Sequence, residues 1–162
     1  MESESINVAT GKPLLKTRTS LFIRGEGGFG GERGPSPKFE APSRKPDHEV
    51  QYQTTADQAL VYRLSGDRNP LQSDPSFAQM GGFDRPILHG LCTYGFTGRA
   101  LLQSICEGDA GRFKAMTGRF SKPVYPGETL SVSMWVDGSE CTFQTRNPAG
   151  DVVLDQGVMT FA

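Results

Sequence analysis

A change in the spacing of apolar residues near residue 113 is the feature that most constrains the fold. Between residues 86 and 105 the apolar side chains follow the spacing of a buried helix. From residue 113 onward the period becomes two, and turns are predicted at 137–138 and 147–150. A long helix followed by an antiparallel meander predicts an α+β fold, with the helix laid against one face of a curled sheet.

Two helices are expected before these strands. The shorter spans residues 55–65, with Thr55 as its capping residue and Gly66 as its end, so that its last turn delivers Asp67. The longer is the buried central helix, which Pro86 opens. Their expected apolar faces contain Leu60, Val61 and Leu64 in the first helix and Ile87, Leu88, Leu91, Phe96, Leu101, Leu102 and Ile105 in the second.

The chain is expected to hold one well-buried domain, residues 48–162, preceded by an arm, residues 1–47. Glycines and prolines between residues 25 and 46 break regular structure repeatedly. Alternation of apolar and polar residues over 15–23 predicts a strand before them. One strand cannot stand alone, so the arm must be completed by other structure.

The arm also repeats part of the C-terminal sequence. Residues 7–22 share Asn, Ala, Gly, Leu and Phe with residues 147–161 when Thr10 is skipped. Two interpretations remain open: an internal duplication, or two hairpins built with the same glycine turn and strand residues. The glycines at 25, 27 and 30 formally match a dinucleotide-binding fingerprint, but Pro35 and Pro37 prevent the helix that such a site needs.

Composition excludes several classes of partner. The 162 residues carry 17 Lys and Arg against 18 Asp and Glu, so no strong field would attract nucleic acid. No apolar run reaches the roughly 20 residues of a membrane-spanning helix, and the first residues do not read as a signal peptide. Cys92, Cys106 and Cys141 lack metal-ligand spacing, so we expect neither a disulfide framework nor a zinc site, and we expect Cys92 and Cys106 in the core.

Two neighbouring motifs carry the candidate chemistry. The first runs Gly66-Asp67-Arg68-Asn69-Pro70-Leu71-Gln72, and the second runs Arg85-Pro86-Ile87-Leu88-His89-Gly90. The Asn-Pro turn between Asp67 and position 72 prevents a continuous helix, so the loop could fold both side chains toward one water molecule. Gly90 falls at the start of the central helix, where free N–H groups favour a developing oxyanion. An Asn-Pro turn is also a common structural device, and it is the pair of motifs that favours a functional site.

Together these motifs resemble the signature of the type 2 enoyl-CoA hydratases, the (R)-specific members of the MaoC-like dehydratase family. The likeness covers residues 20–162 and is similar to the eukaryotic-style members that fuse two repeats, with 25–34 matching the linker that leaves the first repeat. It includes the segments 112–115 and 119–130. The resemblance implies a hot-dog fold, interconversion of trans-2-enoyl-CoA and (R)-3-hydroxyacyl-CoA in fatty-acyl-CoA metabolism, and no metal or redox cofactor.

The resemblance also assigns roles to single residues. In the family, the aspartate matching Asp67 shares acid/base work with a histidine at position 72, and the asparagine matching Asn69 orients one of them or the water. The glycine N–H matching Gly90 holds the thioester oxygen. The further substrate-binding positions that the resemblance implies are Arg68, Pro70, Leu71 and Phe120.

Gln72 stands where the family has its histidine. A glutamine amide can hydrogen-bond a water molecule but cannot take its proton, and loss of a general base costs roughly 10²- to 10⁴-fold in rate. Three interpretations stay open: a deliberate inactivating substitution, a natural inactive subunit, and a working variant in which Asp67 acts alone. The hypotheses for function are an acyl-CoA hydratase impaired by Gln72, or an inactive acyl-CoA-binding scaffold subunit that pairs with an active hot-dog partner.

Acyl-CoA is the expected ligand, and neither nucleic acid nor a membrane is an expected partner. A homodimer or a second hot-dog subunit is expected, because a curled sheet on one helix leaves a strand edge and half of the site open. The expected location is the cytoplasm, or the peroxisomal matrix in a eukaryote. His89 is expected to be a packed, hydrogen-bonded residue. Arg44, Lys45 and Lys122 are weak candidates for contacts with CoA phosphates.

Overall fold

The computed structural model describes residues 2–18, 25–31 and 39–162. Contacts divide the chain into two compact units, Met1–Pro37 and Lys38–Ala162, and each unit is described by itself. The boundary between them precedes the predicted one at residue 47. The reason is that residues just before this position are bound to the sheet of the second unit, as described below.

The described residues of the first unit contain a two-stranded antiparallel hairpin of β1 (Glu2–Ile6) and β2 (Pro13–Arg18). Asn7 holds the turn: its Oδ1 accepts hydrogen bonds from the backbone N–H groups of Ala9 and Thr10, and its carbonyl accepts one from Gly11 at φ +67°. The predicted strand at 15–23 therefore begins at Pro13, and its residues 19–23 lie outside the described ones. β1 was not predicted.

An Asn-to-Gly turn also closes the last hairpin of the second unit, with one residue fewer between Asn147 and Gly150 than between Asn7 and Gly11. The Oδ1 of Asn147 accepts from the N–H of Asp151, and its carbonyl accepts from Gly150 at φ +84°. The sequence echo between 7–22 and 147–161 thus corresponds to a shared Asn-to-Gly turn that joins two antiparallel strands.

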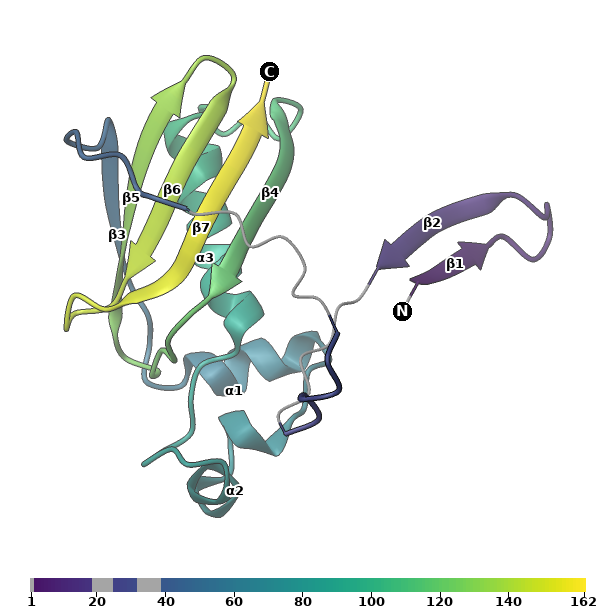
Figure 1. Cartoon of the computed structure of the whole chain (residues 1–162), viewed down its shortest axis with the longest axis vertical. Helices are drawn as coiled ribbons and strands as arrows, with labels where there is room; N and C mark the ends of the chain where they lie inside the picture. The colour runs from purple at the N-terminus through teal and green to yellow at the C-terminus, as the bar shows by residue number, and fades with distance from the viewer. Residues whose placement is uncertain (1, 19–24, 32–38) are drawn as a thin grey trace. The chain divides into compact units, whose positions relative to one another are not determined.

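The second unit contains a five-stranded antiparallel sheet in the order β3-β5-β6-β7-β4 (Figure 1). The long helix α3 (Gly90–Ser104) lies against one face of this sheet (Figure 1). This is the α+β hot-dog arrangement that the sequence predicts. The strands are β3 (His48–Gln53), β4 (Phe113–Phe120), β5 (Thr129–Asp137), β6 (Glu140–Arg146) and β7 (Val152–Phe161).

Two details of the sheet differ from the prediction. The meander covers β5, β6 and β7 only, because β4 pairs with β7 at the far edge. β3, at the opposite edge, was not predicted. Only Val50 and Tyr52 of this short strand are half-buried, so its period-two signal is too brief to stand out from a polar sequence.

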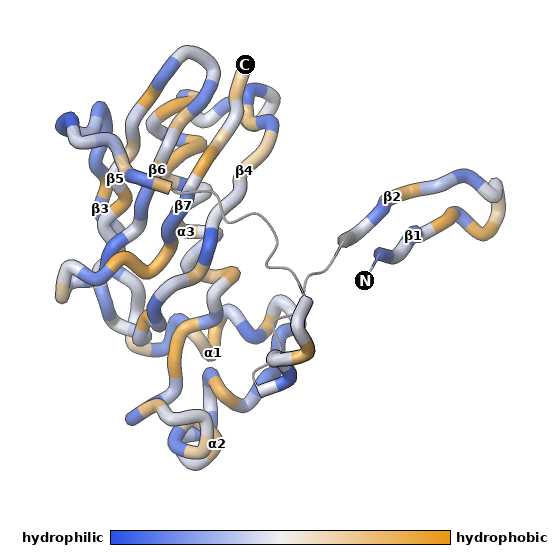
Figure 2. The backbone as a smooth tube through the Cα atoms, in the orientation of Figure 1, coloured by the Kyte–Doolittle hydropathy of each residue, from blue (hydrophilic) through white to orange (hydrophobic). Residues whose placement is uncertain are grey.

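The core lies between α3 and the inner face of the sheet. On β5 the side chains of Leu130, Val132 and Met134 are fully buried, whereas Ser131 and Ser133 between them are not. Figure 2 shows how polar and apolar segments alternate along the strands. The same cluster includes Ala100, Leu101, Ile105, Cys106, Cys141, Phe143, Leu154 and Met159.

A bulge in β7 bends the sheet around the helix. Register shifts occur where β7 meets β6 and β4, and Gln156 takes a left-handed φ of +52°. The next residue has to be glycine, because a Cβ on Gly157 would overlap the ring and the carbonyl oxygen of Phe143. The close approach of β6 and β7 at this point therefore depends on one residue.

Short helical segments connect β3 to α3. The predicted first helix is present as α1 (Gln58–Tyr62) and the 3-10 turn η1 (Arg63–Ser65), beginning at Gln58 instead of Thr55. A second 3-10 turn, η2 (Pro70–Gln72), leads to α2 (Pro75–Met80), which was not predicted although Asp74 caps it. None of the helices in the described ranges is long and apolar enough to cross a membrane.

The aliphatic face of the first helix is not in the core, contrary to the prediction. Leu64 is 84% exposed, and Leu60 and Val61 are about half exposed, because Ala59 and Tyr62 occupy the side that packs inward. Leu91 of α3, also predicted to be buried, is 61% exposed. These corrections concern one region, the surface around the two motifs.

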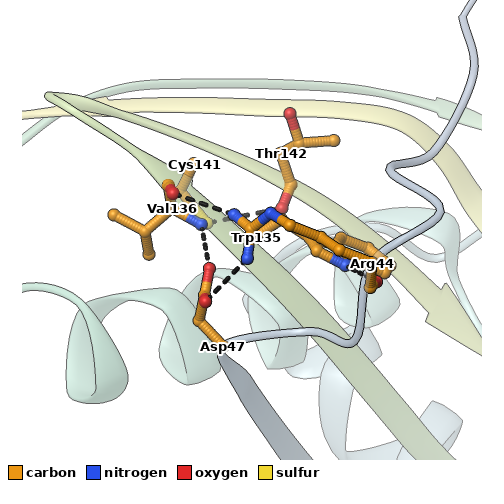
Figure 3. A network of polar contacts seen from close by, with 6 residues as sticks. All are labelled: Arg44, Asp47, Trp135, Val136, Cys141 and Thr142. Atoms are coloured by element: carbon orange, nitrogen blue, oxygen red, sulfur yellow. Dashed lines mark hydrogen bonds and ion pairs between the residues drawn. The ribbon is translucent and has the colours of Figure 1, made fainter.

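The segment just before β3 is hydrogen-bonded to β5 of the sheet (Figure 3). The Asp47 carboxylate accepts hydrogen bonds of 2.7 Å from the Arg44 guanidinium and from the N–H of Val136. Arg44 also donates to the Val136 carbonyl at 2.9 Å, and its own carbonyl accepts from the indole N–H of Trp135. The hydrogen bond from Arg44 is the largest cause that lowers the pKa of Asp47 to about 2.

We expect Asp47 to make stability depend on pH in the acid range. Its pKa is about 2 in the folded chain against an ordinary 3.8, so its contribution is complete above about pH 4 and is lost as the pH falls toward 2. Asp47→Asn should lower the urea midpoint at neutral pH and flatten its decline over this window. Glu49→Gln, which removes an exposed carboxylate from β3, is the matched control. An equal decline in the unaltered chain and in Asp47→Asn would contradict this role.

Candidate active site

The first motif forms a loop shaped by its own polar side chains. Gly66 ends η1 at φ +116°, a conformation that glycine adopts without strain. The Oδ1 of Asp67 accepts from the N–H of Asn69 at 3.2 Å, and the Oδ1 of Asn69 accepts from the N–H of Leu71 at 3.0 Å, which caps η2. The side-chain oxygen of Asn69 is therefore used by its own turn, and its amide NH₂ is the group that could orient a reactant.

The loop runs from an exposed to a half-buried position. Asp67, Asn69 and Pro70 are exposed, whereas Gln72 is half-buried and its Oε1 atom is fully buried without a hydrogen-bond partner among the described residues. Gln72 lines a cavity of about 260 Å³ together with Ala56, Ala59, Leu60, Ser73, Arg85, Pro86 and Pro126. An unpaired acceptor in such a place favours a ligand or water that donates to it.

The second motif ends at the N-terminus of α3. His89 is the N-cap residue and its carbonyl accepts from the N–H groups of Cys92 and Thr93, while Gly90 lies at the exposed first position of the helix. A Cβ on Gly90 would lie 3.2 Å from the ring of Phe120. The two residues line a second cavity of about 260 Å³, whose other walls include Phe83, Ile87, Leu88, Thr93, Lys122 and Val124.

His89 connects the two motifs. Its side chain is 2% exposed, its Nε2 lies 3.1 Å from the backbone carbonyl oxygen of Asp67, and its ring centroid lies 4.7 Å from that of Tyr62. The expected packed and hydrogen-bonded histidine is confirmed. Asp67 is thereby held next to the residue that precedes Gly90.

The structure brings together some predicted site residues and not others. Asp67 is tied to the start of α3, where Gly90 and Phe120 share a cavity, but Gln72 lines a different one. Leu71 is directed toward Gly81 at the end of α2, and Arg68 is exposed. The roles of Arg68 and Leu71 in substrate binding stay predictions.

Two residues near the site carry no role in the sequence analysis. Tyr62 contacts the His89 ring, and Arg85 lines the cavity of Gln72 with its guanidinium 4.7 Å from the centroid of the Tyr125 ring. Arg85 opens the second motif, so its position in the sequence was the available signal. Arg44, a weak candidate for CoA phosphates, is instead engaged with Asp47.

The cysteines are buried thiols. Burial raises the pKa of Cys92 and of Cys141 to about 11, so both stay protonated and poorly nucleophilic near neutral pH. Among the described residues, no three His, Cys, Asp or Glu side chains gather where they could hold a metal ion.

Known proteins resemble this chain over most of its length. A family model described as the MaoC-like domain matches residues 38–158. The 3-hydroxyacyl-thioester dehydratase Y of Mycobacterium tuberculosis is 49% identical over 160 residues, which is 94% of this chain and 55% of the relative. The probable enoyl-CoA hydratase 2 of Dictyostelium discoideum is 48% identical over 155 residues, 93% of this chain and 53% of the relative. The chain spans about half the length of these relatives.

Solved structures agree with this likeness. The full-length peroxisomal multifunctional enzyme type 2 from Drosophila melanogaster is 42% identical with a TM-score of 0.84, covering 99% of this chain and 30% of that one. A MaoC-like dehydratase from Phytophthora capsici is 38% identical with a TM-score of 0.87, covering 99% of this chain and 55% of that one. The α+β hot-dog fold is therefore shared with these structures.

We expect Gly90→Ala to disturb the cavity that it shares with Phe120 and so to weaken binding of the CoA thioester that the sequence resemblance implies as ligand. The new Cβ would press on the Phe120 ring, which must shift within the cavity that both residues line. A cost of about 1 kcal/mol corresponds to a rise in Kd of roughly fivefold, measurable by calorimetry with crotonyl-CoA. Gly95→Ala, on the same helix, is the control, because a Cβ there would meet no side chain and no backbone of another element within 4 Å. Equal Kd values for the two variants would show that the contact does not matter.

Proposed function

The chain belongs to the MaoC-like dehydratase family, and from this premise we propose that it interconverts trans-2-enoyl-CoA and (R)-3-hydroxyacyl-CoA, at a rate reduced by Gln72. One observation carries the proposal: the backbone carbonyl of Asp67 in the first motif is hydrogen-bonded to the side chain of His89, which caps the helix that begins at Gly90 in the second. Relatives at 48% and 49% identity bear the names of a hydratase and a dehydratase.

In the proposed reaction, water adds across the C2–C3 double bond. The Asp67 carboxylate removes a proton from water as the water oxygen bonds to C3, and the π electrons move toward the thioester oxygen to form an enolate. The N–H of Gly90, at the positive end of α3, donates to that oxygen. A proton is then delivered to C2, and the thioester carbonyl re-forms.

Gln72 limits the last step. A histidine at this position could donate a proton to C2, whereas a glutamine amide is too weak an acid and too weak a base to do so near neutral pH. In the unaltered chain Asp67 has to return to C2 the proton that it took from water. Asp67 then has to act both as the base toward water and as the acid toward C2, which favours slow turnover. Because no electrons are transferred between molecules, the proposed reaction needs no redox cofactor.

Gln72 also favours a second candidate function, an acyl-CoA-binding subunit without activity of its own. Such a subunit would keep the cavity beside Gly90 and the loop geometry while an active hot-dog partner performs the reaction. The two candidates differ in one measurable property. Hydration of crotonyl-CoA by the isolated chain is expected above background if it is a slow enzyme and at background if it is a scaffold.

We expect Gln72→His to raise turnover by roughly 10²- to 10⁴-fold, equivalent to about 3 to 5 kcal/mol, because it supplies the missing proton donor and acceptor. KM should change far less. Gln79→His places the same substitution at an exposed position of α2 and should have no effect. A gain below about threefold, or a gain that survives addition of Asp67→Ala, would contradict the assignment of positions 67 and 72 as the acid/base pair.

We further propose that a second hot-dog unit covers the site. In the described part of the second unit, the exposed large apolar side chains lie on α1, η1, α2, the start of α3 and the end of β4. We propose that they form one surface, which we call the motif face: Leu60, Val61, Leu64, Phe77, Met80, Leu91 and Phe120. Next to this face, a trench of about 690 Å³ lies between α3 and the edge strand β4, with Tyr94, Leu102, Phe113 and Met116 among its walls. An apolar surface of this kind beside an edge strand is typical of an interface.

The hairpin of the first unit supports a repeat origin for such a partner. In the second unit, the equivalent hairpin β6–β7 is completed by β4 on one side and β5 on the other. The described residues of the first unit provide only β1 and β2. We propose that this hairpin is the end of a preceding hot-dog repeat, which agrees with relatives about twice as long as this chain.

We expect the isolated chain to form a homodimer through the motif face. Light scattering after size-exclusion chromatography at micromolar concentration should give twice the mass of one chain. Leu91→Glu should shift the protein to a monomer, because it places a charge in the apolar surface, whereas Gln51→Glu on exposed β3 should not. A stable monomer of the unaltered chain would refute the proposal.

The proposed location is the cytoplasm, or the peroxisomal matrix if the source is eukaryotic. Two relatives, from Mus musculus at 50% identity and from Arabidopsis thaliana at 42%, carry the word peroxisomal in their names. The expected ligand is an acyl-CoA, and no nucleic acid or membrane enters the proposed function.

A further inference from the structure

We propose that His89 is a positioning residue for the reaction: its Nε2–H holds the backbone of Asp67 so that the carboxylate stays aligned with the N–H of Gly90. This inference rests on the proposed function. It assigns His89 an indirect role, because no reacting atom has to touch its side chain.

The hydrogen bond fixes which ring nitrogen carries the proton. The partner of Nε2, at 3.1 Å, is the carbonyl oxygen of Asp67, which can only accept. Nε2 must therefore donate, and in the neutral ring Nδ1 is left as an acceptor. Nδ1 is buried and has no hydrogen-bond partner among the described residues.

His89 itself is held rigidly. Its side chain is 2% exposed and its ring packs on Tyr62, while its carbonyl accepts two backbone hydrogen bonds from the first turn of α3. The orientation of its Nε2–H is thus set by the helix and not by the loop. Any group bonded to Nε2 takes its position from the start of α3.

The loop, by contrast, has mostly local hydrogen bonds. The N–H of Gly66 donates to the carbonyl of Arg63, and the N–H of Asn69 donates to the carboxylate of Asp67. Both contacts stay within the segment and cannot place it relative to α3. Asp67 and Asn69 are also exposed, so tight packing does not hold them. The bond from His89 links this segment to the helix that begins at Gly90.

In the described part of the chain, the buried acceptor atoms that lack a partner also lie in the two motifs. Within the described residues, the buried side-chain polar atoms that lack a partner are Nδ1 of His89 and Oε1 of Gln72. Both belong to the two motifs, and both can accept a hydrogen bond. These two buried acceptors can be satisfied by a bound water molecule or another donor, because no side chain or backbone group among the described residues donates to them.

The activity test compares two substitutions in the Gln72→His background, where turnover is expected to be measurable. His89→Gln keeps an N–H donor at the distance of Nε2, whereas His89→Asn is too short to reach Asp67. Because a shift of about 1 Å in a catalytic group can cost up to about 10²-fold, we expect His89→Asn to lower kcat by roughly 10- to 100-fold with KM changed less than about threefold, and His89→Gln to retain kcat within about threefold.

A buried threonine of the same helix provides the control. Thr97 bonds Thr145 at 2.7 Å, away from the loop, so Thr97→Val perturbs packing without affecting Asp67. It should lower the melting temperature but not kcat. Equal losses of kcat in His89→Gln and His89→Asn, or an unchanged kcat in His89→Asn, would overturn the proposal.

A second measurement needs no activity and so separates this proposal from the proposed function. The chain has only two histidines, so the nitrogen-15 spectrum of His48→Gln reports on His89 alone and should show the Nε2–H tautomer. Hydrogen exchange at the N–H of Asn69 should be faster in His89→Asn than in His89→Gln. If Gln72→His stays inactive but these two results hold, the proposed function is wrong and the anchoring of Asp67 stands. An Nδ1–H tautomer or equal exchange rates would refute the anchoring.

Discussion

The packing of α3 against the inner face of the curled sheet is the constraint on which the rest of the second unit depends. Leu101 and Ala100 meet a layer of fully buried side chains from β5, β6 and β7. The β7 bulge, with Gly157 against Phe143, lets the sheet curve around the helix. Once α3 is fixed in this way, its first residues lie at a defined place at the rim of the core, and the candidate site is assembled on them.

The site combines a rigid half and a locally organised half. The rigid half is the start of α3, where His89 is buried and Gly90 faces the Phe120 ring. The other half is a loop that caps its own turns with Asp67 and Asn69. One hydrogen bond, from His89 to the carbonyl of Asp67, joins the two halves. Loss of this bond would change the alignment of Asp67 with Gly90 without changing the structure of either half.

Many features could be read from the sequence because they rest on local physics. Period-two spacing predicted the strands β5, β6 and β7, and the glycine and asparagine turns predicted their connections. The motif predicted a turn at Asn69-Pro70, and that turn is present as the cap of η2. The polar edge strand β3 and the short helix α2 were not predicted, because each is too short to give a distinct period.

Residue spacing and side-chain chemistry were enough to predict the α+β class, the two motifs and the residue types available for acid/base work. Three features emerge only in the folded chain: Leu64 and Leu91 face outward, β4 pairs at the far edge, and Gln72 and Gly90 line different cavities. The physical reason is that periodicity identifies an apolar face but not the surface that covers it. Burial, sheet order and the meeting of distant side chains depend on contacts between segments far apart in the chain.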